Sequence, residues 1–221
     1  MESGYKQEKS YYFDKAFDSN TTTIDVYQQA LTPAIQNVIN GFNSTILAYG
    51  MTGAGKTFTM FGDIYNSMGG IAMNPGIVSL VVRDLFQTFK KESENGFEFN
   101  IKLSYLEIYN EHARDLLTLN SEELMIIEDS RRGIMIPNLT EFAINTHEEV
   151  VKHIIQGNSR RIMASTNANQ FSSRSHAIIQ FTIEKRSKTK DIVDSFLQSK
   201  LCLVDLAGSE RGADVVDQNK Q

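Results

Sequence analysis

The feature that most constrains this 221-residue chain is a glycine-rich loop that matches a known phosphate-binding pattern. Residues 50–57 read Gly-Met-Thr-Gly-Ala-Gly-Lys-Thr and fit G-x-x-x-x-G-K-[ST] at every position. The apolar run 46–49 before the loop predicts a buried strand, and residues 58–61 after it predict the opening of a helix. This order of strand, loop and helix is typical of an α/β domain that binds the phosphates of a nucleotide.

Three glycines, a lysine and a threonine give the loop its expected chemistry. The glycines leave the backbone free to wrap a phosphate chain, so that consecutive N–H groups point at the anion. The start of the following helix adds a partial positive charge at the same place. Lys56 is expected to reach the β- and γ-phosphates, and the Thr57 hydroxyl is expected to bind Mg²⁺. The predicted phosphate-binding residues of the loop are Gly50, Met51, Thr52, Gly53, Ala54, Gly55, Lys56 and Thr57.

The composition is that of a globular protein, since 41% of the residues are apolar and 22% are charged. The length suits one domain with a sizeable core. A net charge of −5 disfavours nucleic acid or an anionic membrane as a bulk partner. The single cysteine, Cys202, excludes an internal disulfide, and the lack of a clustered Cys/His pattern argues against structural zinc. The sequence has neither an apolar signal region at its start nor an apolar run of membrane-spanning length, so we expect a cytosolic protein.

Hydrophobic periodicity predicts strands that alternate with helices. Thr32 is expected to be the N-cap of a helix with Pro33 at its first position, and Thr146 with Glu149 reads as a capping box. The order of elements predicts a phosphate-loop NTPase of the α/β class, whose central, mostly parallel or mixed sheet is covered by helices on both faces. The expected elements are a frayed segment 1–10, strand 11–18, helix 32–41 with Ile35, Val38, Ile39 and Phe42 on one face, strand 46–49, helix 77–91, strand 97–111, a hairpin turn at 131–133, helix 146–162, strand 179–183, a basic loop 185–190 and strand 201–205.

Two later stretches narrow the class of nucleotide enzyme. Asp205 ends an apolar strand, and such a strand beside the phosphate loop supplies the carboxylate that holds Mg²⁺, directly or through water. Gly208 lets the backbone approach the γ-phosphate, and its N–H can sense whether that phosphate is present. Arg174 and Glu210 carry opposite charges and can close over the site as an ion pair. The hydroxyls of Ser172, Ser173 and Ser175 can bind phosphate oxygens, metal or the attacking water.

Each motif also has an ordinary structural explanation. The phosphate-loop pattern can be a simple glycine-rich turn, a serine-rich loop is usually a turn with local caps, and an aspartate at a strand end is often a helix cap. His176 is expected to be a packed or hydrogen-bonding side chain rather than a ligand. The basic residues 185–190 are expected to form a solvated hairpin tip rather than a docking patch. These explanations become weaker because the phosphate loop, the serine-rich loop and the strand that ends at Asp205 occur together in an order that can build one site.

The motifs resemble those of the kinesin motor domain over nearly the whole chain. By this resemblance Ser173 helps to hold Mg²⁺ and the γ-phosphate, and Gly208 bonds the γ-phosphate. Arg174 pairs with Glu210 to organise the hydrolytic water, and Phe58 packs near the adenine. The matching stretches are 13–17, 49–60, 104–111, 114–117, the switch I pattern N-x-x-S-S-R-S-H at 169–176 and the switch II pattern D-L-A-G-S-E at 205–210. The stretches 157–169 and 173–177 look most like the motors that regulate microtubule length.

The chain also departs from that family in two places. Family members begin with a strand that carries an R-x-R-P motif, and none precedes Phe13. They also continue beyond switch II into microtubule-binding helices, further sheet and a neck linker, whereas this sequence ends at Gln221. We therefore expect residues 11–221 to be a partial motor domain that lacks the first strand and the C-terminal microtubule-binding part. The acidic net charge fits this expectation, because tubulin is acidic and the family's basic docking surface lies mostly in that part.

The resemblance implies an ATP-dependent microtubule motor in the cytoplasm, on the cytoskeleton, with ATP and Mg²⁺ as cofactors. The expected partner is the microtubule, built of tubulin, and neither nucleic acid nor a membrane is expected. Dimerisation would need sequence outside this chain, because the sequence contains no convincing heptad repeat. We expect the chain alone to bind nucleotide more weakly than an intact motor and to produce little or no directed movement. Two alternatives stay open: a catalytically inactive kinesin-like module that binds nucleotide or tubulin, and another phosphate-loop enzyme such as a small-molecule kinase.

Overall fold

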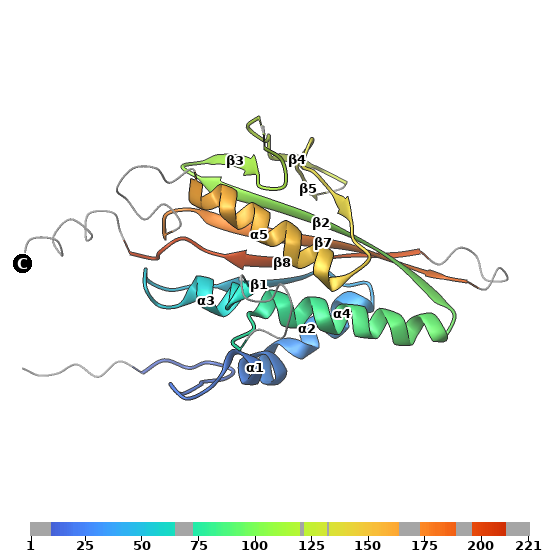
Figure 1. Ribbon diagram of the computed structural model, residues 1–221, viewed down its shortest axis with the longest axis horizontal. Helices are drawn as coiled ribbons and strands as arrows, with labels where there is room; N and C mark the ends of the chain where they lie inside the picture. Colours follow the sequence, from blue (N-terminus) through green and yellow to red (C-terminus); the bar gives the residue numbers. More distant parts are fainter. Residues whose placement is uncertain are drawn as a thin grey trace, which may run out of the picture.

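A six-stranded sheet forms the centre of the molecule (Figure 1). The computed structural model describes residues 10–64, 73–119, 122–131, 133–163, 173–188 and 196–210. Five strands follow the order β1-β8-β7-β2-β3, and β6 pairs with β2 beside them. β1 and β8 run parallel, and the other neighbouring strands are antiparallel. The strands are β1 (Ser44–Ala48), β2 (Phe97–Tyr109), β3 (His112–Asp115), β6 (Phe142–Ala143), β7 (His176–Ser187) and β8 (Phe196–Asp205).

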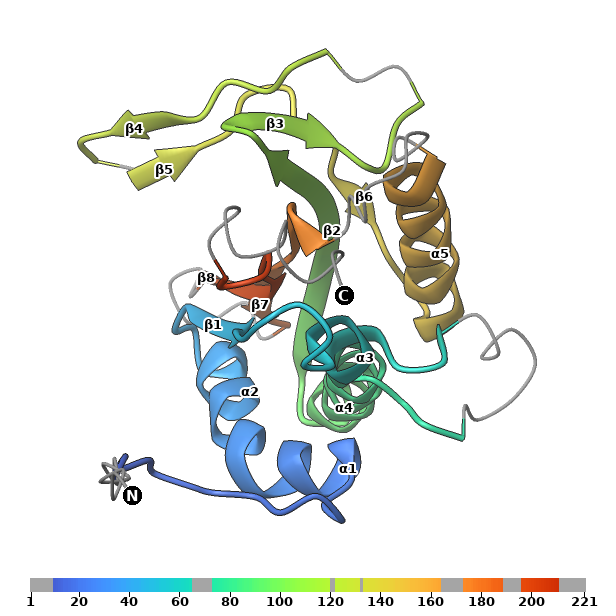
Figure 2. The ribbon, with the colours of Figure 1, turned by 90° about the vertical axis from the view of Figure 1, so that its left-hand side faces the viewer.

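A second, two-stranded sheet stands near β3 at one end of the domain (Figure 2). It consists of β4 (Ile127–Asp129) and β5 (Gly133–Met135), which are antiparallel. The connection between them confirms the hairpin turn predicted at 131–133. At its start the backbone N–H of Arg131 donates to the Asp129 carboxylate over 2.9 Å, a local bond that favours a turn.

The described helices pack on one face of the large sheet (Figures 1 and 2). They are α1 (Thr23–Val26), the π-helical η1 (Tyr27–Leu31), α2 (Thr32–Ile39), α3 (Lys56–Phe61), α4 (Ile77–Glu94) and α5 (His147–Met163). The predicted α/β class with a mixed central sheet is confirmed. The sequence predicted helices on both faces, and the helices of the described residues lie on one. None of these helices is both long enough and apolar enough to cross a membrane.

The alternation of side chains along the strands decides which face the helices cover. In β7 the side chains of Ala177, Ile179, Phe181 and Ile183 are buried on the helix side, whereas Gln180, between two of them, is only half-buried. Burial of each large apolar side chain stabilises the fold by about 1.5–3 kcal/mol. The core partners supplied by the helices include Ile35, Val38, Met60, Val81, Leu85, Val150 and Ile154.

The first long helical segment begins earlier than the sequence predicted. Thr22, not Thr32, is the N-cap: its hydroxyl accepts from the Asp25 N–H over 3.2 Å, and Asp25 accepts from the Thr22 N–H over 3.0 Å. The helical path then passes through η1, where the N–H of Thr32 bonds to the carbonyl of Tyr27, five residues back. α2 itself starts at Thr32 with Pro33 in its first turn, close to the predicted start, but its N-cap is Leu31 and η1 joins it directly to α1.

Two sequence predictions near the N-terminus are wrong: the strand at 11–18 and the burial of Phe42. Residues 11–18 form no strand, and Tyr11, Tyr12 and Phe13 are 72%, 96% and 76% exposed. Aromatic composition alone predicted that strand, and within the described ranges no neighbouring strand supplies its hydrogen bonds. Phe42 is 66% exposed rather than on the buried face of α2, because the helix has already ended at Ile39. The chain turns at Gly41, whose φ of +94° suits the predicted glycine at the helix end.

The later elements follow the sequence prediction more closely. The Glu149 N–H donates to the Thr146 hydroxyl over 3.2 Å, as predicted, but the Glu149 carboxylate accepts from the N–H of Asn145 over 2.7 Å rather than from Thr146. α4 and the long strands also agree in place with the prediction. The basic loop expected at 185–190 is wrong for residues 185–187, which extend β7, and its end lies outside the described residues.

Candidate functional site

The site lies where two parallel strands deliver their carboxyl ends to the same edge of the sheet. β1 leads into the phosphate loop and then into α3, and β8 ends at Asp205, whose Cα pairs in register with that of Ala48. Carboxyl ends of neighbouring parallel strands are where α/β domains place their ligands. The sequence predicted this neighbourhood of loop and aspartate, and the pairing confirms it.

The phosphate loop is shaped by two glycines and closed by its lysine. Gly53 and Gly55 have φ of +81° and +87°, a backbone region that L side chains rarely adopt. The Lys56 ammonium donates to the carbonyl oxygens of Gly50 and Met51, each over 2.8 Å. Residues 51–55 are exposed, so the loop offers its backbone to a ligand while Lys56 bonds to the loop's own carbonyls.

Asp205 and Thr57 form the part of the site that suits a metal ion. The Thr57 hydroxyl donates to Asp205 Oδ2 over 2.7 Å, and Asp205 is only 1% exposed. The other carboxylate oxygen, Oδ1, is buried and has no hydrogen-bond partner within the described part of the chain. Such an oxygen is costly unless a cation or an ordered water meets it. Within the described residues, no group of three or more His, Cys, Asp or Glu side chains could hold a metal ion by itself. Mg²⁺ does not need such a group, because it is commonly held by one or two carboxylates plus substrate phosphates.

The backbone after Asp205 is bonded to the phosphate loop and to switch I. Four consecutive N–H groups, of residues 206–209, donate in turn to Ala48 O (3.3 Å), His176 Nδ1 (3.1 Å), Ser173 O (2.7 Å) and Gly50 O (3.0 Å). Because His176 Nδ1 accepts, a neutral His176 carries its proton on Nε2. The expectation that His176 is a hydrogen-bonding side chain is confirmed. The Gly208 N–H, expected to sense the γ-phosphate, bonds to the Ser173 carbonyl here.

Glu210 reaches across to the phosphate loop instead of to Arg174. Its carboxylate accepts from the Thr52 N–H over 2.9 Å and from the Thr52 hydroxyl. The hydrogen bonds from Thr52 lower the pKa of the Glu210 carboxyl. Among the described residues no ion pair joins Glu210 to Arg174, whose side chain is exposed. The pair predicted from opposite charge is therefore not formed in this structure, because Thr52 already occupies the carboxylate.

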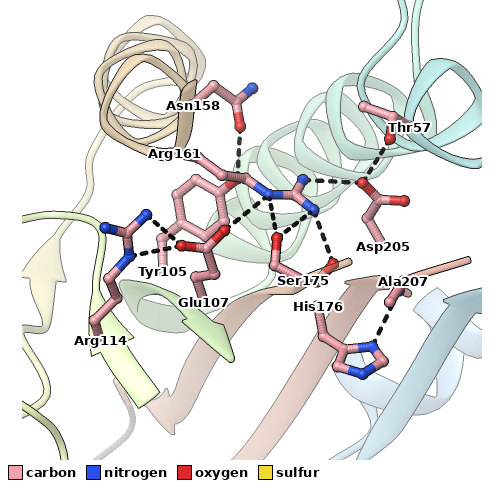
Figure 3. A network of polar contacts seen from close by, with 10 residues as sticks. All are labelled: Thr57, Tyr105, Glu107, Arg114, Asn158, Arg161, Ser175, His176, Asp205 and Ala207. Atoms are coloured by element: carbon pink, nitrogen blue, oxygen red, sulfur yellow. Dashed lines mark hydrogen bonds and ion pairs between the residues drawn. The ribbon is translucent and has the colours of Figure 1, made fainter. Parts of the chain in front are cut away.

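Asp205 belongs to a network of charged side chains that is mostly buried (Figure 3). Arg161 of α5 donates from Nη1 to Asp205 Oδ2 over 3.0 Å, from Nη2 to the Ser175 carbonyl over 3.0 Å and from Nε to Glu107 Oε1 over 3.3 Å. Arg114 of β3 donates from Nε to Glu107 Oε2 over 2.6 Å. The side chains of Arg161, Glu107 and Asp205 are 4%, 0% and 1% exposed. Two arginines thus balance two carboxylates, with Arg161, Glu107 and Asp205 buried and Arg114 partly exposed at the edge of the network.

Sequence reasoning missed Arg161 and Glu107, although a signal for Glu107 was present. Glu107 has the same strand parity as Leu103 and Tyr105, which both face the core, so the alternation alone places a carboxylate inside. A buried carboxylate needs a cation. Nothing in the local sequence around Arg161 indicates that it, rather than its neighbour Arg160, is that cation, because the choice depends on how α5 lies on β2.

A close approach at Gly157 fixes how α5 lies on β2. A Cβ at this position would meet the Tyr105 ring carbons at 2.4 and 2.6 Å. The Tyr105 hydroxyl donates to Asn158 Oδ1 over 2.5 Å, next along the helix. With glycine here the helix packs tightly against the ring, and Arg161, one turn further, lies over Glu107 and Asp205 (Figure 3).

The remaining predicted site residues are placed as follows. Phe58, expected near the adenine, is about half exposed on α3, close to the phosphate loop. Ser173 is half-buried, and its carbonyl accepts from Gly208. Ser175, expected to offer its hydroxyl to the ligand, is fully buried and is bonded to Arg161 instead. The first part of the switch I pattern, 169–172, lies outside the described residues.

Comparison with known proteins places the chain in one family. A family model of the kinesin motor domain matches residues 1–221. Kinesin-like protein KIF19 of Homo sapiens is 40% identical over 215 residues, which make up 97% of this chain and 21% of the human protein. Kinesin-like protein KIP3 of Saccharomyces cerevisiae is 40% identical over 208 residues, or 93% of this chain and 25% of the yeast protein. A solved structure of a fast kinesin has a TM-score of 0.84 and 34% identity, and the match covers 94% of this chain and 56% of that one.

Proposed function

The chain belongs to the kinesin motor-domain family, and we propose that it is a motor domain that hydrolyses ATP and couples hydrolysis to microtubule binding and movement. The observation that carries this proposal is the phosphate loop lying beside Asp205, whose buried Oδ1 lacks a hydrogen-bond partner in the described part. The chain spans about a fifth to a quarter of the two curated relatives' lengths, 21% and 25%. The activity of a whole motor is therefore part of this proposal.

ATP would be held by the loop and the start of α3. The backbone N–H groups of residues 50–57 would surround the phosphates, with Gly53 and Gly55 giving the loop its shape. Lys56 would exchange the Gly50 and Met51 carbonyls for the β- and γ-phosphates, which carry more negative charge than a carbonyl oxygen. Phe58 exposes enough of its ring to pack against the base.

Three side chains of the site would hold Mg²⁺ together with the nucleotide: Thr57, Ser173 and Asp205. Oxygen donors of this kind fit the ion, and the buried Oδ1 of Asp205 supplies a carboxylate oxygen that still needs a partner. When bound, Mg²⁺ neutralises the charge that develops on the phosphates during phosphoryl transfer. Arg161 holds Asp205 in place through Oδ2, so that Oδ1 remains available.

Gly208 is proposed as the residue that detects the γ-phosphate. Its N–H bonds to the Ser173 carbonyl over 2.7 Å, a contact that directly joins switch II to switch I. If this N–H turned to the γ-phosphate, the contact would be given up and both loops would rearrange. Arg174 and Glu210 would then pair to orient the attacking water, as the family resemblance implies.

The proposed partner is the microtubule, and the proposed location is the cytoplasm, on the cytoskeleton. The family match supports both. The second candidate function is a kinesin-like module that binds nucleotide or tubulin without turnover. One observation favours it: Glu210 is bonded to Thr52 and stays away from Arg174.

Steady-state ATP hydrolysis with and without microtubules separates the two functions. The experiment compares the 221-residue chain with Lys56→Ala, and with Lys152→Ala as a control, because Lys152 is an exposed lysine of α5 outside the site. The motor proposal expects turnover that Lys56→Ala abolishes and that Lys152→Ala leaves unchanged, and acceleration by microtubules would support coupling to them. Nucleotide binding without turnover in either condition would overturn the motor proposal and favour the inactive module.

A further inference from the structure

Thr52 and Glu210 form a contact that the family resemblance does not assign. Thr52 lies near the start of the phosphate loop, and Glu210 lies at the end of switch II, 158 residues later. Both hydrogen-bond donors of Thr52, its N–H and its hydroxyl, point to the two carboxylate oxygens of one side chain. Bonds to an ionised carboxylate are stronger than those between neutral groups, so this contact ties the two loops together more firmly than a backbone contact would.

The contact needs the glycine of switch II. A Cβ at Gly208 would lie 2.4 Å from the Thr52 hydroxyl and 2.4 and 2.6 Å from the two Glu210 carboxylate oxygens. The Thr52–Glu210 pair therefore occupies the space that any other residue at 208 would fill. The absence of a side chain at 208 thus serves the Thr52–Glu210 contact as well as close approach of the backbone to a phosphate.

Glu210 has two candidate partners and one carboxylate. Resting on the proposed function, we propose that Thr52 is a positioning residue that holds the Glu210 carboxylate on the phosphate loop, away from Arg174, until nucleotide binds. Binding of the phosphates separates Thr52 from Glu210, and the freed carboxylate pairs with Arg174. The Arg174–Glu210 pair that orients the attacking water can therefore form only when nucleotide occupies the phosphate loop.

The electrostatics of the loop agree with this exchange. In this structure the Glu210 carboxylate is the anion that the Thr52 N–H meets. The triphosphate brings several negative charges into the same loop and repels that carboxylate. Arg174 is exposed and has no ion pair with Glu210 within the described residues, so it can receive the carboxylate once Thr52 releases it.

The first test needs no nucleotide. Amide hydrogen exchange, followed by NMR on the nucleotide-free 221-residue chain, reports the Thr52 N–H directly. In Glu210→Ala the Thr52 amide should exchange about tenfold faster, because its acceptor over 2.9 Å is gone. The Leu203 amide, within the β8 strand, serves as an internal control and should not change. An unchanged Thr52 amide would overturn the proposal, whatever the chain's ATPase activity.

The second test measures affinity for a slowly hydrolysed ATP analogue. Thr52→Val keeps the shape of the side chain but removes the hydroxyl donor. It should bind the analogue about threefold to tenfold more tightly, because a smaller fraction of the molecules has Glu210 bonded to residue 52. The matched control is Thr45→Val on the exposed side of β1, which should bind like the unchanged chain. In a Glu210→Ala background the gain from Thr52→Val should disappear.

The outcomes distinguish this inference from the proposed function. Weaker or equal analogue binding by Thr52→Val, together with normal binding by Thr45→Val, would overturn the positioning role of Thr52 while leaving the nucleotide site intact. A gain that persists in the Glu210→Ala background would also overturn it. Failure of every variant and of the unchanged chain to bind the analogue would refute the proposed function instead, and the amide-exchange result would still decide whether the contact exists.

Discussion

Removing the buried arginine behind the site should destabilise the whole domain. In Arg161→Met the side chain keeps a similar length but loses its charge and its bonds to Asp205, Glu107 and Ser175. Of the two almost completely buried carboxylates, Glu107 would keep Arg114 as its cation, whereas Asp205 would keep only the Thr57 hydroxyl among its partners in the described part of the chain. Their desolvation would no longer be offset, so the folded state should lose stability.

The expected loss follows from the burial of the network. Removing one partner of a buried ion pair costs about 3–5 kcal/mol, because the charge left behind has no compensation. No discount for solvent screening applies, since Arg161 is 4% exposed and its two carboxylate partners are 0% and 1% exposed. For a chain of this length each kcal/mol shifts the melting temperature by about 2–4 °C, so the expected decrease is about 6–20 °C.

Thermal unfolding followed by circular dichroism measures this decrease. The matched control is Lys152→Met, the same loss of a cation from an exposed position of the same helix, which should change stability by about 0.5 kcal/mol or less. Arg161→Met should also couple to Glu107→Gln, so that the double variant loses less than the sum of the two single variants. A loss below about 1 kcal/mol for Arg161→Met would refute the reasoning that the network is buried and charge-balanced.

Two further predictions concern α5. Gly157→Ala should lower the melting temperature, because its Cβ would meet the Tyr105 ring at 2.4 Å and overpacking costs about 1–3 kcal/mol, whereas Ser159→Ala on the exposed side should have little effect. Burial lowers the pKa of His153, which stacks on Phe142 at 4.6 Å, so below about pH 6.5 the unfolded chain binds the extra proton more readily. The chain's melting temperature should therefore fall from pH 8 to pH 5 by more than that of His153→Phe, and an equal fall in both would contradict this reading.

The phosphate loop and the position of Asp205 could be predicted from the sequence because both depend on local signals. Gly53, Gly55 and Lys56 have their roles within one short loop, and an aspartate at the end of an apolar strand must emerge at the strand's carboxyl end. Parallel pairing of that strand with β1 then brings Asp205 to Thr57 without any further information.

The errors occurred where a distant partner decides the outcome. The Pro33 signal is a local exception: α2 does start at Thr32, but a capping box at Thr22 and the π-helical turn before Thr32 make the helical path begin earlier. Opposite charges suggested an Arg174–Glu210 pair, but Thr52, 158 residues from Glu210, competes for the same carboxylate. The sequence could not show that Arg161, rather than Arg160, is the buried cation, because the contact of Gly157 with Tyr105 determines how α5 packs on β2.

Binding of ATP with Mg²⁺ to the 221-residue chain, measured by isothermal titration calorimetry, tests the central claim most directly. The unchanged chain and Lys152→Ala should bind one nucleotide per chain, and Lys56→Ala should lose most of that affinity, because the β- and γ-phosphates lose their cation. Binding should also weaken when Mg²⁺ is chelated. Equal affinity in the unchanged chain and Lys56→Ala, or no heat of binding from a chain that still unfolds cooperatively, would contradict the assignment of this loop as the nucleotide site.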